Sequence, residues 1–258
     1  QSRKADWHEW IARCADWKKR YPFVLPEHRA SAEISVYAFS EALASALNES
    51  DIVLPGSSGV ACEIFLSAFQ AKSGQRIFHN KGTGAMGLGQ PAALGACLAG
   101  GGRRTVCVDG DGGFHMNAQE LETVLRLNLP IKFFVIDNAG YASIRASQRN
   151  YFKRMTGADA GSQMTLPDVL QVAKAYELPV FDLVDSVSMR STIAQVLNSP
   201  GAVVCRVKTL ADEERMPRVS SFRKADGSMD SMPLEDMWPL LPREEFLENM
   251  IVSPLAIS

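Results

Sequence analysis

The stretch from Arg104 to Tyr141 constrains the fold more than any other part of the sequence. It begins with an apolar run at Thr105–Val108, continues through a glycine-rich turn and a helical pattern, and ends with a second apolar run at Ile131–Ile136. Short apolar runs on either side of a helical pattern are typical of buried parallel strands. The stretch therefore predicts a strand–helix–strand unit inside a parallel sheet.

Both predicted strands end in polar turns. Gly110-Asp111-Gly112-Gly113 follows the first run and Asp137-Asn138 follows the second. Ligands of open α/β sheets bind at the carboxyl edge of the strands, so we expect Asp111 and Asn138 to lie close together. A carboxylate and an amide oxygen suit Mg²⁺ or Ca²⁺, and neighbouring glycines let the backbone approach an anion. The pattern indicates a metal that bridges phosphate oxygens, the alternative being that both side chains only form turns.

These motifs resemble those of a known enzyme family. Gly110-Asp111-Gly112 followed by Asp137-Asn138 resembles the thiamine-diphosphate motif GDG…(N/D)N, and the flanking residues resemble the acetolactate synthase group. The run Gly84–Ala96 resembles the sequence GAMGFGLPAAIGA of that group. Two long motifs in the right order are specific, whereas GDG alone would be a weak signal.

The resemblance implies a metal site and a cofactor site. Mg²⁺ would be held by Asp111, Asn138 and the carbonyl of Gly140, while Met86 would support a folded thiamine and Gly84 would contact its aminopyrimidine. By pattern alone Met86 is a core residue, and Ser57-Ser58-Gly59 suits ordinary helix capping as well as a phosphate. The expected cofactor contacts are Ser57, Ser58, Gly59, Gly84, Met86, Gly110, Asp111, Gly112, Gly113, Asn138, Gly140, Tyr141, Ala142, Ser143 and Ile144.

The resemblance also implies an activity and a partner domain. Enzymes of this group use thiamine diphosphate to decarboxylate a 2-keto acid such as pyruvate and to transfer the acyl unit to a second carbonyl compound; the full-length enzyme can also carry FAD. Their activating glutamate lies on a pyrimidine-binding domain of the same or a neighbouring subunit, and neither Glu63 nor Glu120 matches it. We therefore expect half of a shared site, in a homo-oligomer (dimer or tetramer), that is inactive or very slow by itself.

One departure from the acetolactate synthase pattern concerns the substrate. The tryptophan expected nine positions after Asn138 is replaced by Ser147. The run Arg145–Phe152 looks more like acetolactate-synthase-like enzymes of surface-sugar biosynthesis, which is fold-level analogy. Arg145 and Arg149 are candidates to contact an acidic substrate, and solvated helix charges are the plainer alternative.

Two other functions remain open at this point. Gly82–Gly87 matches G-x-G-x-x-G, and Asp109 lies at a suitable distance for the acidic residue of an NAD- or FAD-linked oxidoreductase. Pro91 inside the following helix and a poor preceding strand weaken that interpretation. A non-catalytic partner subunit of a thiamine-diphosphate enzyme would explain the unmatched glutamate.

Composition limits the remaining classes. A net charge of −2 gives no electrostatic case for nucleic acid or an anionic membrane. No apolar run reaches the roughly 18–20 residues that span a bilayer. The five cysteines show no CxxC spacing, so a reduced, cytoplasmic chain is the simplest expectation.

Strand and helix patterns alternate along the chain as far as Leu210. They predict an α/β fold with a doubly wound, mostly parallel sheet of about six strands and helices on both faces, as in the thiamine-diphosphate-binding fold. Residues 1–30 read as a helical linker from a preceding domain, and 31–210 as the domain that binds the diphosphate and Mg²⁺. Residues 211–258 are rich in breaker signals and are expected to form an irregular tail.

Overall fold

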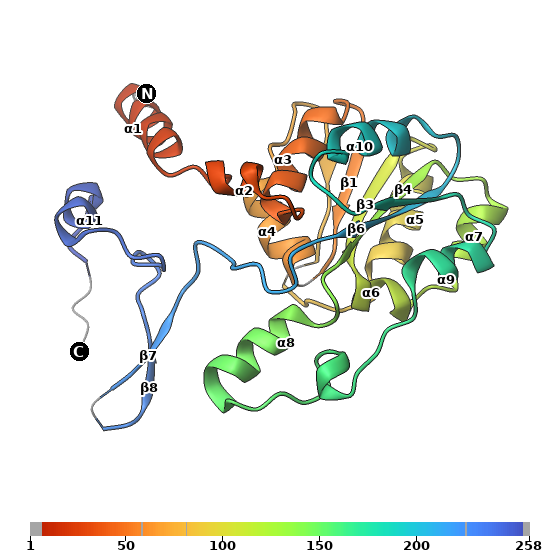
Figure 1. Cartoon of the computed structure of the whole chain (residues 1–258). Coiled ribbons are helices and arrows are strands. Elements are labelled where there is room, and N and C mark those ends of the chain that lie inside the picture. Colours follow the sequence, from red (N-terminus) through yellow and green to blue (C-terminus); the bar gives the residue numbers. More distant parts are fainter. Residues whose placement is uncertain (1–6, 58, 81, 225, 255–258) are drawn as a thin grey trace. The chain divides into compact units, whose positions relative to one another are not determined.

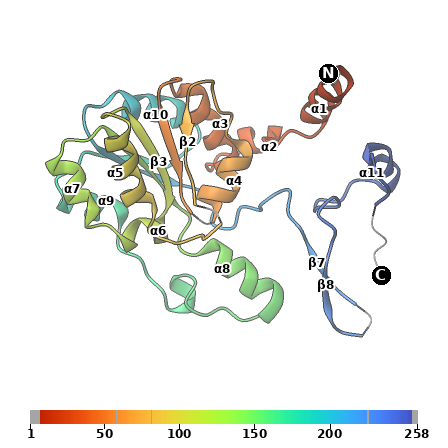
Figure 2. The same ribbon diagram turned by 180° about the vertical axis from the view of Figure 1, so that it is seen from behind.

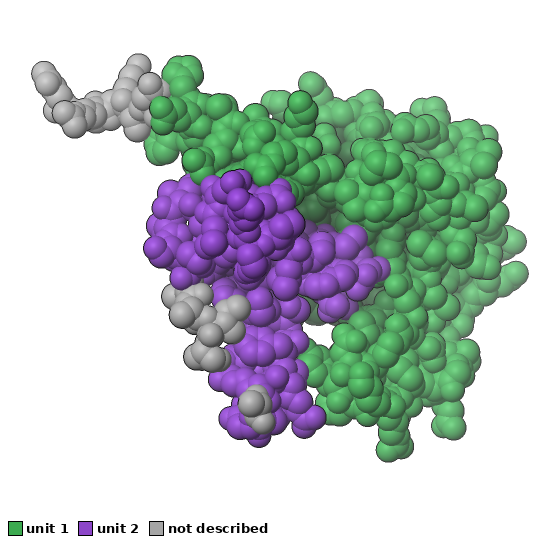
Figure 3. Space-filling view, turned by 60° about the vertical axis from the view of Figure 1, so that its left-hand side comes forward, with its two compact units in different colours: residues 1–213 green, residues 214–258 purple. Residues whose placement is uncertain are grey.

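The computed structural model describes residues 7–57, 59–80, 82–224 and 226–254 (Figure 1). Within these ranges the chain divides into two units, residues 1–213 and 214–258, which Figure 3 colours separately. In the described ranges no helix is long and apolar enough to cross a bilayer. The larger unit contains the parallel sheet.

A six-stranded parallel sheet is the centre of the larger unit. Its strand order is β2-β1-β3-β4-β6-β5, and every neighbouring pair is parallel. This confirms the predicted doubly wound α/β fold. The strands are β1 (Ile52–Pro55), β2 (Arg76–Ile77), β3 (Thr105–Gly110), β4 (Ile131–Asp137), β5 (Val180–Leu183) and β6 (Val203–Lys208).

Helices cover both faces of the sheet, as Figures 1 and 2 show from opposite sides. One face carries α3 (Val36–Ala46), α4 (Val60–Ala68) and α10 (Met189–Asn198). The other face carries α5 (Gly89–Ala99), α6 (Asp111–Met116), α7 (Glu120–Arg126) and α9 (Val169–Ala175). In the sequence, α1 (His8–Arg20) and α2 (Pro26–Ala30) precede these helices. Helix α8 (Ala142–Ser147) follows β4 and continues into a π-helical turn, Gln148–Phe152.

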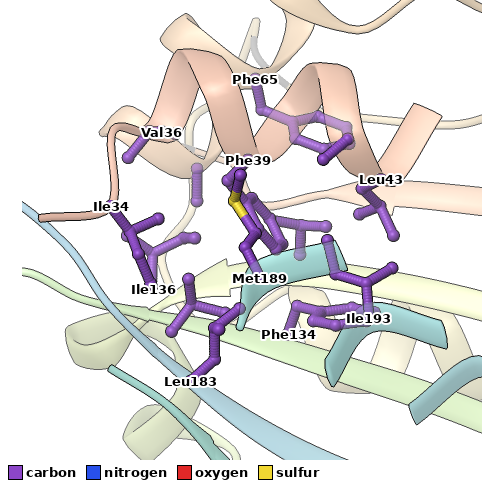
Figure 4. Close-up of a cluster of buried hydrophobic side chains, with 14 of the residues drawn as sticks. Ile34, Val36, Phe39, Leu43, Phe65, Phe134, Ile136, Leu183, Met189 and Ile193 are labelled. Carbon is purple, nitrogen blue, oxygen red and sulfur yellow. The ribbon is translucent and has the colours of Figure 1, made fainter. Parts of the chain in front are cut away.

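The structure explains why the sequence of strand β4 is mostly apolar. Phe134 and Ile136 point into the cluster beneath α3, α4 and α10, whereas Phe133 and Val135 point to the opposite face. Side chains alternate between the faces of a strand, so a strand covered on both sides needs apolar residues at nearly every position. The buried exception is Lys132, whose ammonium group donates to the carbonyls of Ser199 and Gly201. The rings of Phe134 and Phe39 of α3 lie 5.6 Å apart in the first cluster (Figure 4).

The point where the sheet changes winding direction lies between β1 and β3. From β1 the chain moves outward to β2, and it then returns to β3 on the other side of β1. Helix α4 follows β1 and helix α6 follows β3, and these two helices pack on opposite faces of the sheet. A crevice forms at such a switch point, beyond the carboxyl ends of the strands.

The carboxyl group of Asp109, at the end of β3, is enclosed by glycines from three separate elements. A Cβ atom at Gly56, Gly89 or Gly113 would lie 2.6, 2.2 or 2.6 Å from the Asp109 carboxylate oxygens. No side chain fits at those distances, so the end of β1, the start of α5 and the start of α6 approach the strand only because each carries glycine there. We call this arrangement the Asp109 niche.

Burial changes the acidity of Asp109. Its pKa is raised to about 7, mainly by loss of hydration. The charge of Asp111 also raises the pKa, and the Gly110 amide lowers it. Oδ1 accepts the Gly110 amide at 2.8 Å, whereas the buried Oδ2 has no partner among the described residues. A carboxyl group in such a site holds its proton to a higher pH than it does in the unfolded chain.

The N-terminal helices were expected to form a linker from a preceding domain, and residues 211–258 were expected to form an irregular tail. Helix α1 has no buried residue, and its predicted packing against a preceding domain stays a prediction. The segment 214–258 is more regular than the expected irregular tail. It contains an antiparallel hairpin, β7 (Ser221–Arg223) and β8 (Met229–Ser231), and helix α11 (Arg243–Asn249). Local turn signals did not reveal this pairing because strands of three residues carry too short a pattern.

Gly89→Ala should destabilise the protein by about 1–3 kcal/mol, because its methyl group would lie 2.2 Å from Asp109 Oδ2 and force the niche apart. Urea unfolding measures the change. Gly95→Ala is the matched control on the same helix, since its Cβ would meet no atom within 4 Å. That control should be neutral or slightly stabilising, because alanine favours helix. Equal stability of both variants would contradict the niche.

Without metal or cofactor, the contribution of Asp109 to the free energy of unfolding should fall as pH rises from about 4 to about 7. Asp109 is still protonated in the folded chain in this window, with a pKa of about 7 against an ordinary 3.8, whereas the unfolded chain has released the proton. Asp109→Asn should remove up to roughly one proton from the slope, about 1.4 kcal/mol per pH unit. Urea titrations across that range test this, and an unchanged slope in the variant would refute it.

Candidate functional site

The turns after β3 and β4 are joined through the carboxylate of Asp111. Gly110 pairs with Ile136 in the sheet register, so both strands reach the same edge. Oδ1 of Asp111 accepts the amide of Gly112 at 2.7 Å, and Oδ2 accepts the amide of Gly140 at 2.9 Å. The side chain of one turn thereby fixes the backbone of the other.

A cavity of about 80 Å³ opens beside this junction. It lies at the carboxyl edge of β1, β3 and β4, at the point where the sheet changes winding direction. Most of the cofactor contacts expected from the sequence share its wall. The lining residues are Gly59, Val60, Ala61, Met86, Asp109, Gly110, Asp111, Gly112, Gly113, Asn138, Gly140, Tyr141, Ala142, Ser143 and Ile144.

Among the described residues, two expected contacts are not on this wall. Ser57 is buried and Gly84 lies in the turn before α5, but neither lines the cavity. Ser58 lies outside the described residues. Asp109, Val60 and Ala61 line the cavity and were not among the expected contacts. The signals for them were the position of Asp109 directly before the GDG motif and the start of a helix after Gly59.

Helices α4, α6 and α8 all begin at the cavity wall. The first amides of a helix have no acceptor within the helix, and the helix dipole makes that end positive. Val60 and Ala61 open α4, and Gly113 and Ser143 lie in the first turns of α6 and α8. The amides of Gly112 and Ala142 already donate to Asp111 Oδ1 and to the Gly140 carbonyl. The wall therefore favours an anion such as a phosphate group.

Gly110 gives that anion access to the backbone, whereas Gly112 is covered. A Cβ at Gly110 would meet nothing within 4 Å, so space is open beside it. A Cβ at Gly112 would lie 2.2 Å from Cε1 of Tyr141 and 3.1 Å from Cε of Met86. These two side chains thus close over Gly112, and Met86 is 36% exposed on the cavity wall rather than packed in the core.

The carboxylate of Asp111 is held in a poorly hydrated position. Its pKa is raised to about 6, mainly by burial. The charge of Asp137 also raises the pKa, whereas the amides of Gly140 and Gly112 and the charge of Arg145 lower it. A buried carboxylate with a raised pKa gains most from a cation placed beside it.

The donor set suits Mg²⁺ with a diphosphate. Asp111 supplies a carboxylate, Asn138 an amide and Gly140 a carbonyl, all hard oxygen donors around one cavity. Each carboxylate oxygen accepts one amide, which leaves further lone pairs for a metal. Among the described residues no group of three or more His, Cys, Asp or Glu side chains could enclose a metal. The protein donors therefore fit an ion that completes its shell with phosphate oxygens and water.

The structure corrects the interpretation of Arg145. It is neither a substrate contact nor a solvated helix charge, because it is 3% exposed and four hydrogen bonds join its guanidinium to three backbone carbonyls and to Asp212. Arg149 is half exposed and pairs with Asp212 at 2.6 Å. Sequence periodicity on a short helix did not distinguish these two arginines.

The dinucleotide alternative finds no support in the geometry. Its acidic residue, Asp109, is enclosed in the glycine niche and is not free to reach a ribose. Strand β2 ends at Ile77, several residues before the glycine motif that should follow it directly. The same motif instead brings Met86 to the cavity wall.

Known proteins match the same region of the chain. The family described as "Thiamine pyrophosphate enzyme, C-terminal TPP binding domain" matches residues 57–207. The acetolactate synthase isozyme 1 large subunit of Escherichia coli (strain K12) is 26% identical over 216 residues, 84% of this chain and 37% of that protein. The isozyme 2 large subunit of the same organism is 32% identical over 183 residues, 68% of this chain and 28% of that protein.

A solved structure agrees on the fold. The crystal structure of benzoylformate decarboxylase from Polynucleobacter necessarius superposes with a TM-score of 0.63 at 18% identity, over 73% of this chain and 35% of that one. At this identity the likeness concerns the fold alone. The chain spans about a third of the length of the relatives it matches. From the motifs, the cavity and the family match together, the chain belongs to the thiamine pyrophosphate enzymes and carries their C-terminal TPP-binding domain.

Proposed function

We propose that this chain binds the diphosphate and Mg²⁺ of thiamine diphosphate in an enzyme that decarboxylates a 2-keto acid, with pyruvate the favoured substrate, and transfers the acyl unit to a second carbonyl compound. The observation that carries the proposal is the junction of Asp111 with Gly140 beside three helix starts. A cation and an anion are both favoured there, within one small cavity.

The chain's own residues would bind and orient the cofactor. Thiamine diphosphate, when bound, supplies the carbon nucleophile that attacks the keto group and takes up the electrons left when carbon dioxide departs. Asp111, Asn138 and the Gly140 carbonyl would hold Mg²⁺, and the amides at the helix starts would bind phosphate oxygens. Met86 would support the bent cofactor, while Tyr141 and Ile144 would exclude water from the wall.

The rest of the active site would come from a pyrimidine-binding domain. The cavity, about 80 Å³, is smaller than the roughly 300–1,000 Å³ of pockets that enclose a whole ligand. Neither Glu63 nor Glu120 lines it, which supports an activating glutamate elsewhere. A homo-oligomer in which neighbouring subunits complete the site fits this arrangement. A non-catalytic partner subunit is the second candidate, supported by the same lack of a glutamate among the described residues of the wall.

The acceptor substrate is proposed from the segment after the cavity. Ser147 stands near the end of α8, where acetolactate synthases carry a bulky tryptophan. A smaller side chain there favours a larger acceptor, and a keto sugar of surface-polysaccharide synthesis is our proposed class.

Asp111→Asn should abolish most Mg²⁺-dependent binding of thiamine diphosphate. The neutral amide has no charge for the metal, and the loss should exceed the roughly 10- to 100-fold that removal of a metal ligand's supporting partner costs. Isothermal titration calorimetry of the complete protein, with and without Mg²⁺, measures it. Glu120→Gln is the control, since this acid lies on α7 away from the cavity and should leave binding unchanged. Wild-type affinity in the Asp111 variant would remove the metal from our proposal.

The purified 258-residue chain alone should show no carboligation of pyruvate above background, because no carboxylate matching the activating glutamate lies on its cavity wall. Product formation by discontinuous colorimetric assay, with saturating thiamine diphosphate and Mg²⁺, checks this. Turnover by the chain alone would contradict a shared site, whereas activity that returns when a pyrimidine-binding domain is added would favour the catalytic subunit over the non-catalytic one.

A further inference from the structure

Arg145 lies on α8 with its guanidinium beneath the turn that follows β4. We propose that Arg145 is a positioning residue for the Mg²⁺-binding turn 138–140: it holds this turn against the protein so that the Asn138 side chain and the Gly140 carbonyl face the metal. The inference rests on the proposed function, because it concerns the same cavity.

The guanidinium contacts two successive carbonyls of the turn. Nη2 donates to the Asn138 carbonyl at 2.8 Å, and Nη1 donates to the Ala139 carbonyl at 3.0 Å. On the cavity side, Asp111 holds the Gly140 amide at 2.9 Å. The peptide group that joins Ala139 and Gly140 is therefore held at both ends, its N–H by the Asp111 carboxylate and its carbonyl by the guanidinium, which also holds the carbonyl of the preceding peptide group.

The conformation of the turn explains why it needs this support. Ala139 has φ of +61° and Gly140 has φ of +117°, so two successive residues leave the ordinary regions. Alanine adopts the left-handed region only at a cost, and such residues persist where their surroundings fix them. A Cβ at Gly140 would lie 2.6 Å from the Ala158 carbonyl, which leaves the backbone little room to relax.

The other side of the guanidinium is anchored to residues 209–213, which we call the strap. Nε of Arg145 donates to Asp212 Oδ1 at 2.9 Å, and Nη2 also donates to the Ala211 carbonyl. The strap is fixed in turn by Thr209, whose amide donates to the Asp137 carbonyl at 3.0 Å, and by Glu213, whose carboxylate accepts the Val36 amide at 2.7 Å.

Only an arginine can make this set of contacts. Its planar fork carries five N–H donors in fixed directions, whereas a lysine ammonium has three donors on one atom. Arg145 uses the fork to connect two carbonyls of the turn to a carboxylate and a carbonyl of the strap. Arg149 pairs with the same Asp212 but has no recorded contact with the turn, which makes it a matched control.

The test compares Arg145→Gln, Arg145→Lys and Arg149→Gln in the complete protein. Calorimetric titration of Mg²⁺ at saturating thiamine diphosphate gives the Kd for the metal, and thermal unfolding without ligands gives the stability. We expect Arg145→Gln to weaken Mg²⁺ binding about 10- to 100-fold, as expected for a partner that orients metal ligands. Raising Mg²⁺ should restore cofactor binding. Arg149→Gln should stay within about twofold of wild type, because a half-exposed ion pair contributes little.

The lysine variant keeps the positive charge, so it provides a second test of the inference if the glutamine variant misfolds. It should weaken Mg²⁺ binding in the same direction, because one ammonium cannot span both carbonyls and Asp212. Variants that lose thermal stability but retain wild-type Mg²⁺ affinity would overturn the inference and leave Arg145 a purely structural residue. If the wild-type protein shows no Mg²⁺-dependent binding, the proposed function fails along with it.

Discussion

The hydrogen bond from the Gly140 amide to the Asp111 carboxylate is the interaction on which the site depends. It joins turns that follow two neighbouring strands, and it uses a side chain that burial has already made reluctant to ionise. The sheet brings the two turns to one edge, and the glycines leave room for the carboxylate to reach across. Without that link, the cavity wall would consist of two independent loops.

The sequence contained enough local information to predict the sheet and most of the cavity. The run Ile131–Ile136 is apolar except for Lys132 because β4 is covered on both faces, so it stands out against the polar turns. Asp111 and Asn138 were expected together because parallel strands end at the same edge. The glycines of the GDG motif could also be assigned to the cavity from the sequence, because they lie at the end of the first predicted strand.

The features that escaped prediction depend on contacts between distant segments. Arg145 is buried because carbonyls of its own preceding turn and residues far along the chain converge on it, and helix periodicity carries no trace of that. The wall position of Val60 depends on where α4 starts relative to β3, which no local pattern fixes. The hairpin of Ser221–Arg223 with Met229–Ser231 is too short for its alternation to be recognised. Asp109 resembled a dinucleotide-binding acid because of its distance from Gly82–Gly87, and its enclosure was not readable because the enclosing glycines are spread over the sequence.

The Asp109 niche also bears on how this domain can diverge. Its carboxyl group occupies volume bordered by Gly56, Gly89 and Gly113, which belong to three different segments. Each of these four positions is therefore tolerant or intolerant of change according to the residue at the other three. Strong epistasis follows. A smaller residue at position 109 would allow larger residues at the three glycine positions, whereas a larger residue at a glycine position would be tolerated only after position 109 had changed.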